Sequence, residues 1–561
     1  MDPLTDGTQT PAPDASIRLR AATLWQLAAT YIPYLITAGV LLLLLIRGEK
    51  FWMTNDDIRM SMTVGGYGIT AAPSPDLVLE SSVVWGWILQ HLPDVAGIRA
   101  YTLTDYLLFL ASGLALLYAL RRLKVPPLFA AAALLSMYSV VILLPQFTLL
   151  AGYLSVAGFA LVLASDRHNL RRSMAAAAFF LVLAGLVRPD ELGLVFLVVS
   201  PFLLQAWFTQ DRTWRLHWLG AAVGCGLVLA VAFFFNLHYS SGGPWQDYAD
   251  MQDIGGEVIA YNLGTYLIQH PDKLAAAHVS VNDVNIMRSW FFLDPKFFNS
   301  ANFTALVDSV TLVDRAGFNG SFIKPLLKMS RDPAFETLMA LFVLFSALNW
   351  RRCIAEVASF AVLLALMVGI SLYGRPGELR IWLPAAAAMV ALSLLRLGPR
   401  HGKLVLLLGI VAMLGALHEC ETLYKHNARV AAAGRQARTV DCALVPKDRV
   451  VVVWTDAAQY RWKDIYRPFT RDDDPCDPKL YAIASYQLAP PSLAQLYAAT
   501  GGRNLVEALL AGQQLYILTS KDRLKMLDTY LQEHYQAHLE WQQVAKNAFY
   551  QAYTIQAAHW P

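Results

Sequence analysis

Two adjacent carboxylates, Asp56 and Asp57, lie in the segment TNDDIRM, a few residues after a long apolar run. A carboxylate can accept a proton from a hydroxyl group as a general base, and its oxygens can also bind a hard divalent cation. The same pair could equally belong to a solvated loop. The choice depends on which other charged residues the fold brings near the pair.

Three arginines occur in the short segments LVRPDELGL and YGRPGELRIWLP, each of which joins two apolar runs. A guanidinium group stays charged at any relevant pH and matches a phosphate group bidentately. The alternative is that each arginine pairs with a neighbouring carboxylate and only closes a turn. The arginines are Arg188, Arg375 and Arg380, and the neighbouring carboxylates are Asp190, Glu191 and Glu378.

Two further segments contain candidate residues. Residues 77–92, LVLESSVVWGWILQHL, are apolar and too short to cross a bilayer, so they predict an interfacial helix that begins near Glu80. Glu80 could act at a site or simply favour a helix start. Residues 280–299 include Asp283 and Trp290, a mixture that suits a sugar surface but equally predicts an amphipathic helix packed on other helices.

Composition indicates what must position these residues. The 561 residues are 56% hydrophobic and 16% charged, and the mean hydropathy is +0.40, which is too apolar for an ordinary soluble protein. Apolar runs long enough to cross a bilayer predict a polytopic α-helical membrane protein with about 11 transmembrane helices. The runs cover residues 24–46, 101–120, 126–144, 147–165, 173–187, 192–208, 217–236, 335–350, 353–372, 381–396 and 403–418.

Basic residues predict the orientation, because short cytoplasmic loops are enriched in lysine and arginine. With a cytoplasmic N-terminus, every inner loop is basic. These loops contain RLR at 18–20, RRLK at 121–124, DRHNLRR at 166–172, DRTWR at 211–215, RR at 351–352 and RLGPRHGK at 396–403. The protein is therefore expected in a bacterial-type inner membrane, with its C-terminal part in the periplasm.

Three parts of the chain follow from this topology. Residues 1–22 are a polar cytoplasmic tail, residues 23–418 form the transmembrane domain, and residues 419–561 form a soluble α/β domain on the outer face. The transmembrane domain has two long outer loops, 47–100 and 237–334. In the last part, strand-like runs at 449–454, 480–486 and 513–520 surround a helix-like run, and a long helix is expected at 521–540.

Three of the five cysteines, Cys420, Cys442 and Cys476, fall in the outer part, where one disulfide could form and one thiol would remain. We expect the pair to be Cys442 with Cys476.

The topology places both acidic residues and all three arginines on one face. Arginines beside carboxylates at a membrane surface suit a phosphorylated substrate that an alcohol attacks. A lipid-carrier phosphate bearing a sugar fits best, because its tail can lie between helices. The sequence contains no phosphate-cradling GxxxxGK[ST] motif and no histidine or cysteine cluster with metal-ligand spacing.

These segments resemble the GT-C glycosyltransferases, which use polyprenyl-phosphate sugars on the outer face of a membrane. The resemblance is greatest to the arabinofuranosyltransferase-like branch, in the order NDDIRMS, LESSVVWGWIL, LVRPDELG and RIWLP. It implies a GT-C-like fold, Asp56 or Asp57 as general base, and Arg188 and Arg380, with Arg375 less well matched, as phosphate ligands. Glu191 stands where that branch commonly has glycine, which leaves the donor sugar open.

The sequence thus predicts an inverting glycosyltransferase whose partners are a polyprenyl-phosphate sugar, membrane lipids, and an acceptor glycan, lipid or protein, without nucleic acid. Asp190, Glu191, Glu378, Glu80, Asp283 and Trp290 are candidates for binding sugar or acceptor. A divalent cation such as Mg²⁺ or Mn²⁺ between the aspartates and the donor phosphate stays open. Alternatives are a transporter or lipid flippase, which uninterrupted spans with charges at one face disfavour, and a polymerase or ligase that uses pyrophosphate-linked oligosaccharides.

Overall fold

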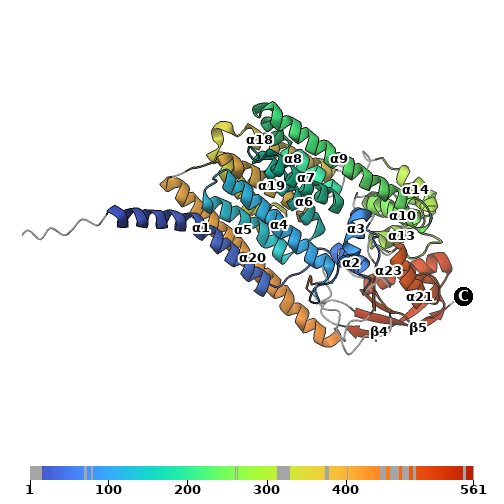
Figure 1. Ribbon diagram of the computed structural model, residues 1–561. Coiled ribbons are helices and arrows are strands. Elements are labelled where there is room, and N and C mark those ends of the chain that lie inside the picture. The colour runs from blue at the N-terminus through green and yellow to red at the C-terminus, as the bar shows by residue number, and fades with distance from the viewer. Residues whose placement is uncertain are drawn as a thin grey trace, which may run out of the picture.

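The structure is a computed structural model of the chain (Figure 1). It describes residues 15–67, 73–77, 80–259, 261, 263–311, 327, 329–372, 378–400, 402–441, 450–454, 467–469, 479–483, 488–546 and 551–559.

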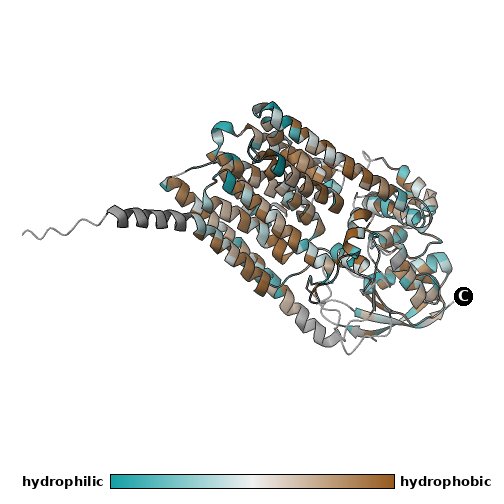
Figure 2. Ribbon diagram, in the orientation of Figure 1, coloured by the Kyte–Doolittle hydropathy of each residue, from teal (hydrophilic) through white to brown (hydrophobic). Residues whose placement is uncertain are grey.

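An apolar helical bundle occupies most of the chain (Figure 2). Within the described residues, eight helices are long and apolar enough to cross a membrane, and three shorter apolar helices stand among them. The prediction of a polytopic helical membrane protein is confirmed, and each predicted run lies on one of these helices. They are α1 (Ala15–Arg47), α4 (Ala100–Arg122), α5 (Pro127–Leu143), α6 (Phe147–Leu163), α7 (Leu170–Val187), α8 (Pro189–Thr209), α9 (Arg212–Ser240), α17 (Pro333–Leu348), α18 (Ile354–Leu372), α19 (Leu379–Leu397) and α20 (Lys403–Asp441).

The helices α5, α6 and α19 form the centre of the bundle, because nearly all of their side chains are buried. Small residues allow close approach: a Cβ atom at Gly152 of α6 would lie 2.2 Å from Cβ of Pro384 in α19. By contrast, α1 and α9 expose many large apolar side chains. Such surfaces are expected where helices face lipid.

Two short helices, α2 (Asn55–Gly65) and α3 (Val83–Gln90), lie at one end of the bundle. The chain before α3 is tied to the ends of α7 and α9. The amide of Ser82 donates to the carbonyl of Leu186 at 2.9 Å, and the amide of Val83 donates to Oδ1 of Asn236 at 2.9 Å. The helix predicted at 77–92 is therefore shorter than expected, and Glu80 lies in the turn before it.

The long segment predicted at 237–334 contains several short helices in its described part, with an irregular stretch at 289–299. Its helices are α10 (Gly243–Ile259), α11 (Leu263–Gln269), α12 (Pro271–Ala276), α13 (Val281–Arg288) and α14 (Ser300–Asp308). Phe291 packs against Trp454 with ring centroids 5.1 Å apart, and both belong to a second core shared with the C-terminal part.

The C-terminal part contains a five-stranded sheet with the strand order β2-β1-β3-β5-β4. The strand β1 is parallel to β2 and β3, whereas β5 is antiparallel to β3 and β4. The predicted α/β character is confirmed. The elements are β1 (Val450–Val453), β2 (Lys479–Ala482), α21 (Pro490–Ala499), α22 (Leu505–Leu510), β3 (Tyr516–Thr519), α23 (Lys521–Tyr535), β4 (His538–Lys546) and β5 (Gln551–His559).

The end of the chain differs in part from the prediction. The prediction of a helix over 521–540 is wrong at its C-terminal end. Helix α23 ends at Tyr535, because Gln536 adopts a left-handed conformation (φ 53°). Helix α20 runs without a break through residue 419, so the division of the chain at that residue stays a prediction. Cys420 is a free, buried thiol, and the predicted pair Cys442 and Cys476 lies outside the described residues.

Candidate functional site

Two arginine–carboxylate pairs lie at the end of the bundle that carries α2 and α3. The guanidinium of Arg380 donates to Oδ2 of Asp56 at 2.7 Å, and that of Arg188 donates to Oε2 of Glu80 at 2.9 Å. The four side chains are 14–21% exposed, so they are largely but not fully shielded from solvent. The structure therefore joins residues that are 324 and 108 positions apart in sequence.

Asp57 has a different environment from its neighbour. Its side chain is fully buried, and Oδ1 accepts hydrogen bonds from the Tyr101 hydroxyl at 3.0 Å and from the Phe147 amide at 2.8 Å. Phe147 is the first residue of α6, so this carboxyl group satisfies a helix N-terminal amide that has no partner inside the helix. Thr54 donates to Oδ2 at 3.2 Å. Asp57 is thus held by its surroundings.

Burial changes the protonation of this group. Loss of solvent, and then the nearby charge of Asp56, raise the pKa of Asp57 to about 8. Burial and the charge of Asp56 also raise the pKa of Glu80, and the positive charge of Arg188 partly offsets this increase. At neutral pH Asp57 is largely protonated, whereas Asp56 has Arg380 as its direct counterion.

A third arginine, Arg59, belongs to the same cluster. It is 7% exposed and lies near Asp56, Glu80 and Asp76, whose charges favour its protonated form. Burial is the larger effect and lowers the pKa of Arg59 to about 10. Arg59 is not among the residues that the sequence predicts for the site. The available signal was its spacing, because positions three apart, as in Asp56 and Arg59, share one face of a helix.

The carboxylates next to Arg188 and Arg380 in sequence differ in burial and in their partners. Glu378 adds a second ion pair to Arg380, with Oε2 at 2.6 Å from Nε. Asp190 is exposed at the start of α8. Glu191, one residue later, is buried beside Gly152 of α6, and its Oε1 has no hydrogen-bond partner within the described residues. Arg375 lies outside the described residues.

The candidates in residues 280–299 have partners in another place. Asp283 is fully buried, forms a capping box with Ser280 at the start of α13, and accepts from Nε2 of His534 in α23 at 2.8 Å. Trp290 packs edge-to-face against Phe292 in the second core. These contacts fit the alternative of helix packing. A role of either residue in binding sugar stays a prediction.

Metal-binding geometry gives no support to the aspartate pair. Across the residues that the structure describes, the one group of three ligand atoms spaced for a metal ion is Asp283, Glu533 and His534. Its members already bond to one another or to Ser280. The divalent cation between Asp56 or Asp57 and a phosphate stays a prediction.

Fold and site together define a polytopic helical membrane protein with a cluster of arginines and carboxylates at one end of the bundle. The chain matches no protein-family model and no curated protein. Two solved structures are similar to it over 96% of this chain and 98% of theirs, both with a TM-score of 0.39. They are ArnT from Cupriavidus metallidurans bound to undecaprenyl phosphate, at 15% identity, and the same protein in the apo state, at 14% identity. Similarity at this level does not transfer an activity, so the site itself must support any function.

Proposed function

We propose that this chain is a membrane glycosyltransferase of the GT-C type that transfers a sugar from a polyprenyl-phosphate donor to an acceptor hydroxyl. The observation that carries the proposal is the cluster of Arg188, Arg380 and Arg59 with carboxylates at one end of an apolar bundle. A lipid-linked phosphate would bring its head group to this cluster while its hydrocarbon tail stays beside the apolar helices.

The arginines suit a phosphate leaving group. Each guanidinium has five N–H donors, of which Arg188 uses one in its bond to Glu80. The donor phosphate would take further donors of Arg188 and Arg380 and replace part of the contact with the carboxylates. Charge-assisted bonds of this kind strengthen as negative charge develops on a departing phosphate.

Asp56 is the better placed of the two aspartates to act as base. It lies at the partly exposed edge of the cluster, whereas Asp57 is buried and bonded to α6. In the proposed step the acceptor hydroxyl gives its proton to Asp56 and its oxygen bonds to the anomeric carbon. The bond from that carbon to the phosphate oxygen breaks, and the electron pair leaves with the polyprenyl phosphate. Attack opposite the leaving group inverts the anomeric centre.

Asp57 would serve as a positioning residue. Its bond to Phe147 fixes the start of α6, and the Phe147 ring lies 5.0 Å from the guanidinium carbon of Arg188. Through Phe147, the carboxyl group of Asp57 would thereby help to position Arg188, one of the proposed phosphate ligands.

Finer assignments rest on the sequence motifs. This proposal also includes three finer points: membership of the arabinofuranosyltransferase-like branch, a bacterial inner membrane with the site on its outer face, and an acceptor that is a glycan, a lipid or a protein.

The test measures sugar transfer from a panel of synthetic polyprenyl-phosphate sugars by the purified protein. Arg188→Ala and Arg380→Ala should each lower transfer by roughly a hundredfold or more, because removing one such donor costs about 3 kcal/mol. Lysine at either position should restore transfer only in part, since an ammonium group does not bind bidentately. The matched control is Arg467→Ala, which breaks a 2.9 Å pair with Glu49 outside the cluster.

Three results would contradict the proposal. Full transfer in either alanine variant would make that arginine a structural residue. Movement of a lipid or solute without a glycosidic product would favour a transporter. Transfer only from pyrophosphate-linked oligosaccharides would favour a polymerase or ligase.

A further inference from the structure

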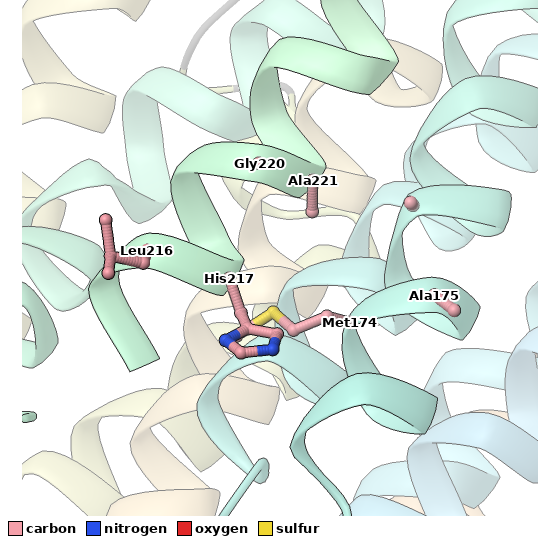
Figure 3. A pocket seen from close by; sticks show the side chains of 7 residues that line it. Met174, Ala175, Leu216, His217, Gly220 and Ala221 are labelled. Atoms are coloured by element: carbon pink, nitrogen blue, oxygen red, sulfur yellow. The ribbon is translucent and has the colours of Figure 1, made fainter. Parts of the chain in front are cut away.

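A groove on the side of the bundle lies far from the charged cluster. It has a volume of about 420 Å³ and is lined by the early turns of α7 and α9 (Figure 3). Small side chains make the hollow, and His217 is its polar lining residue. The lining residues are Met174, Ala175, Ala178, Leu216, His217, Gly220 and Ala221.

On the side of the bundle, the groove lies toward the end that is opposite to the proposed active site. Met174 and Arg188 are 14 positions apart along α7 and its C-cap, which corresponds to about 21 Å of helix. The groove therefore cannot be part of the arginine–carboxylate cluster, and its occupant is a separate question.

Two exposed arginines lie one helical turn before lining residues of the groove. Arg171 precedes Met174, Ala175 and Ala178 by three, four and seven positions, and Arg212 precedes Leu216 by four. Residues at these spacings share a face of a helix. Both arginines therefore belong to the groove faces.

The charges of these two arginines are not neutralised by the protein. Neither Arg171 nor Arg212 forms an ion pair within the described part of the chain, whereas the acidic residues Asp166 and Asp211 are each paired with another arginine. Helix α7 also begins here without a side-chain cap, so the positive end of its dipole adds to these charges, whereas the carboxylate of Asp211 caps the start of α9. An anionic group is favoured at this position.

We propose that this groove binds an anionic phospholipid of the adjacent leaflet. One acyl chain would lie along the apolar lining between α7 and α9, and the phosphate would contact Arg171, Arg212 and His217. Basic pockets between transmembrane helices favour anionic head groups, and each arginine near the membrane surface adds about fivefold to affinity. This inference is independent of the proposed function, because it concerns neither the cluster nor its donor.

The test uses the full chain reconstituted in nanodiscs with equal amounts of phosphatidylglycerol and phosphatidylcholine, extracted in detergent, and measured for retained lipid by mass spectrometry. Wild type should retain phosphatidylglycerol in clear excess. Arg171→Ala and Arg212→Ala should each lower that retention about fivefold. Arg351→Ala is the matched control, because it removes an equal charge from a basic loop outside the groove.

A second variant tests the hydrocarbon part. Gly220→Leu should fill the groove and lower retention to a similar extent, since a Cβ atom at Gly220 would have no protein atom within 4 Å. Gly226→Leu, which has equal space but does not line the groove, should behave like wild type.

Equal retention of the two lipids by wild type would overturn the proposal. So would wild-type retention in the arginine variants, or in Gly220→Leu. A loss that appeared equally in the controls Arg351→Ala and Gly226→Leu would overturn it as well, because the groove would then have no special part in retention.

Discussion

Asp56→Asn and Asp57→Asn are the most informative pair of substitutions in this chain. Both keep the size of the side chain and remove one carboxyl group from adjacent positions of α2. The structure predicts unequal results, because Asp56 faces Arg380 at the partly exposed edge of the cluster and Asp57 is buried against Tyr101 and Phe147.

The expected magnitudes follow from these environments. Loss of a general base lowers the rate by about 10²–10⁴-fold, which equals about 3–5 kcal/mol of activation free energy. Asp56→Asn should therefore lower kcat by at least about a hundredfold. Asp57 has a pKa of about 8 and is largely protonated at neutral pH, so an amide of the same shape replaces it closely. Asp57→Asn should lower kcat by less than about tenfold.

Donor binding separates catalysis from binding. Without the Asp56 carboxylate, Arg380 loses one of its two carboxylate ion pairs and keeps the one with Glu378. A phosphate then competes with one carboxylate fewer, so Asp56→Asn should bind polyprenyl phosphate at least as tightly as wild type while transfer is lost. Asp57→Asn should bind it like wild type.

The assay combines transfer from synthetic polyprenyl-phosphate sugars with binding of polyprenyl phosphate itself. Equal losses of transfer in the two variants would refute the division of roles between the aspartates. A larger loss in Asp57→Asn would reverse that division. Wild-type turnover in Asp56→Asn would remove the general base from the proposal.

Three more predictions concern stability and topology. Since the folded pKa of Asp57 is about 8 and its unfolded value is about 3.9, stability from its bound proton is complete below pH about 4 and is lost as the pH rises through 8. The melting temperature of wild type relative to Asp57→Asn should therefore fall between pH 5 and pH 8, and a constant difference would contradict this. Gly152→Ala should lower the melting temperature strongly, because its Cβ would overlap the proline of α19, whereas Gly193→Ala has open space and should not. Reporter fusions should be active outside the cytoplasm after residue 430 and inside it at residue 168, and a cytoplasmic C-terminus would contradict the proposed orientation.

The transmembrane helices could be predicted because their signal is local. A run of apolar residues specifies a helix in lipid almost independently of its neighbours. Even α5 and α6, with 17 residues each, were recognisable from hydropathy alone. The strands β4 and β5 were not, because their residues HLEWQQVAK and QAYTIQAAH alternate poorly, and because β5 also pairs with β3, which precedes α23 in the sequence.

The membership of the site was only partly predictable, because its pairs are long-range. Sidedness indicated that Arg188 and Arg380 share a face with Asp56 and Glu80. It could not indicate that Arg188 bonds to Glu80, since Asp190 lies only two positions from Arg188 in the sequence and is the more obvious partner. Arg380 shows both kinds of contact, one to the neighbouring Glu378 and one to Asp56 across the bundle.

The different roles proposed for Asp56 and Asp57 follow from the geometry of α2. Consecutive residues of an α-helix point about 100° apart, so the two carboxyl groups cannot both face the arginines. The rotation of α2 decides which one does. Met60 lies on the same face as Asp57, three positions on, and its sulfur also contacts the Tyr101 hydroxyl, which turns that face into the bundle. Asp56 and Arg59 are thereby left beside Arg380 and Glu80. The sequence contains the pair but not this rotation, which depends on packing against α4 and α6.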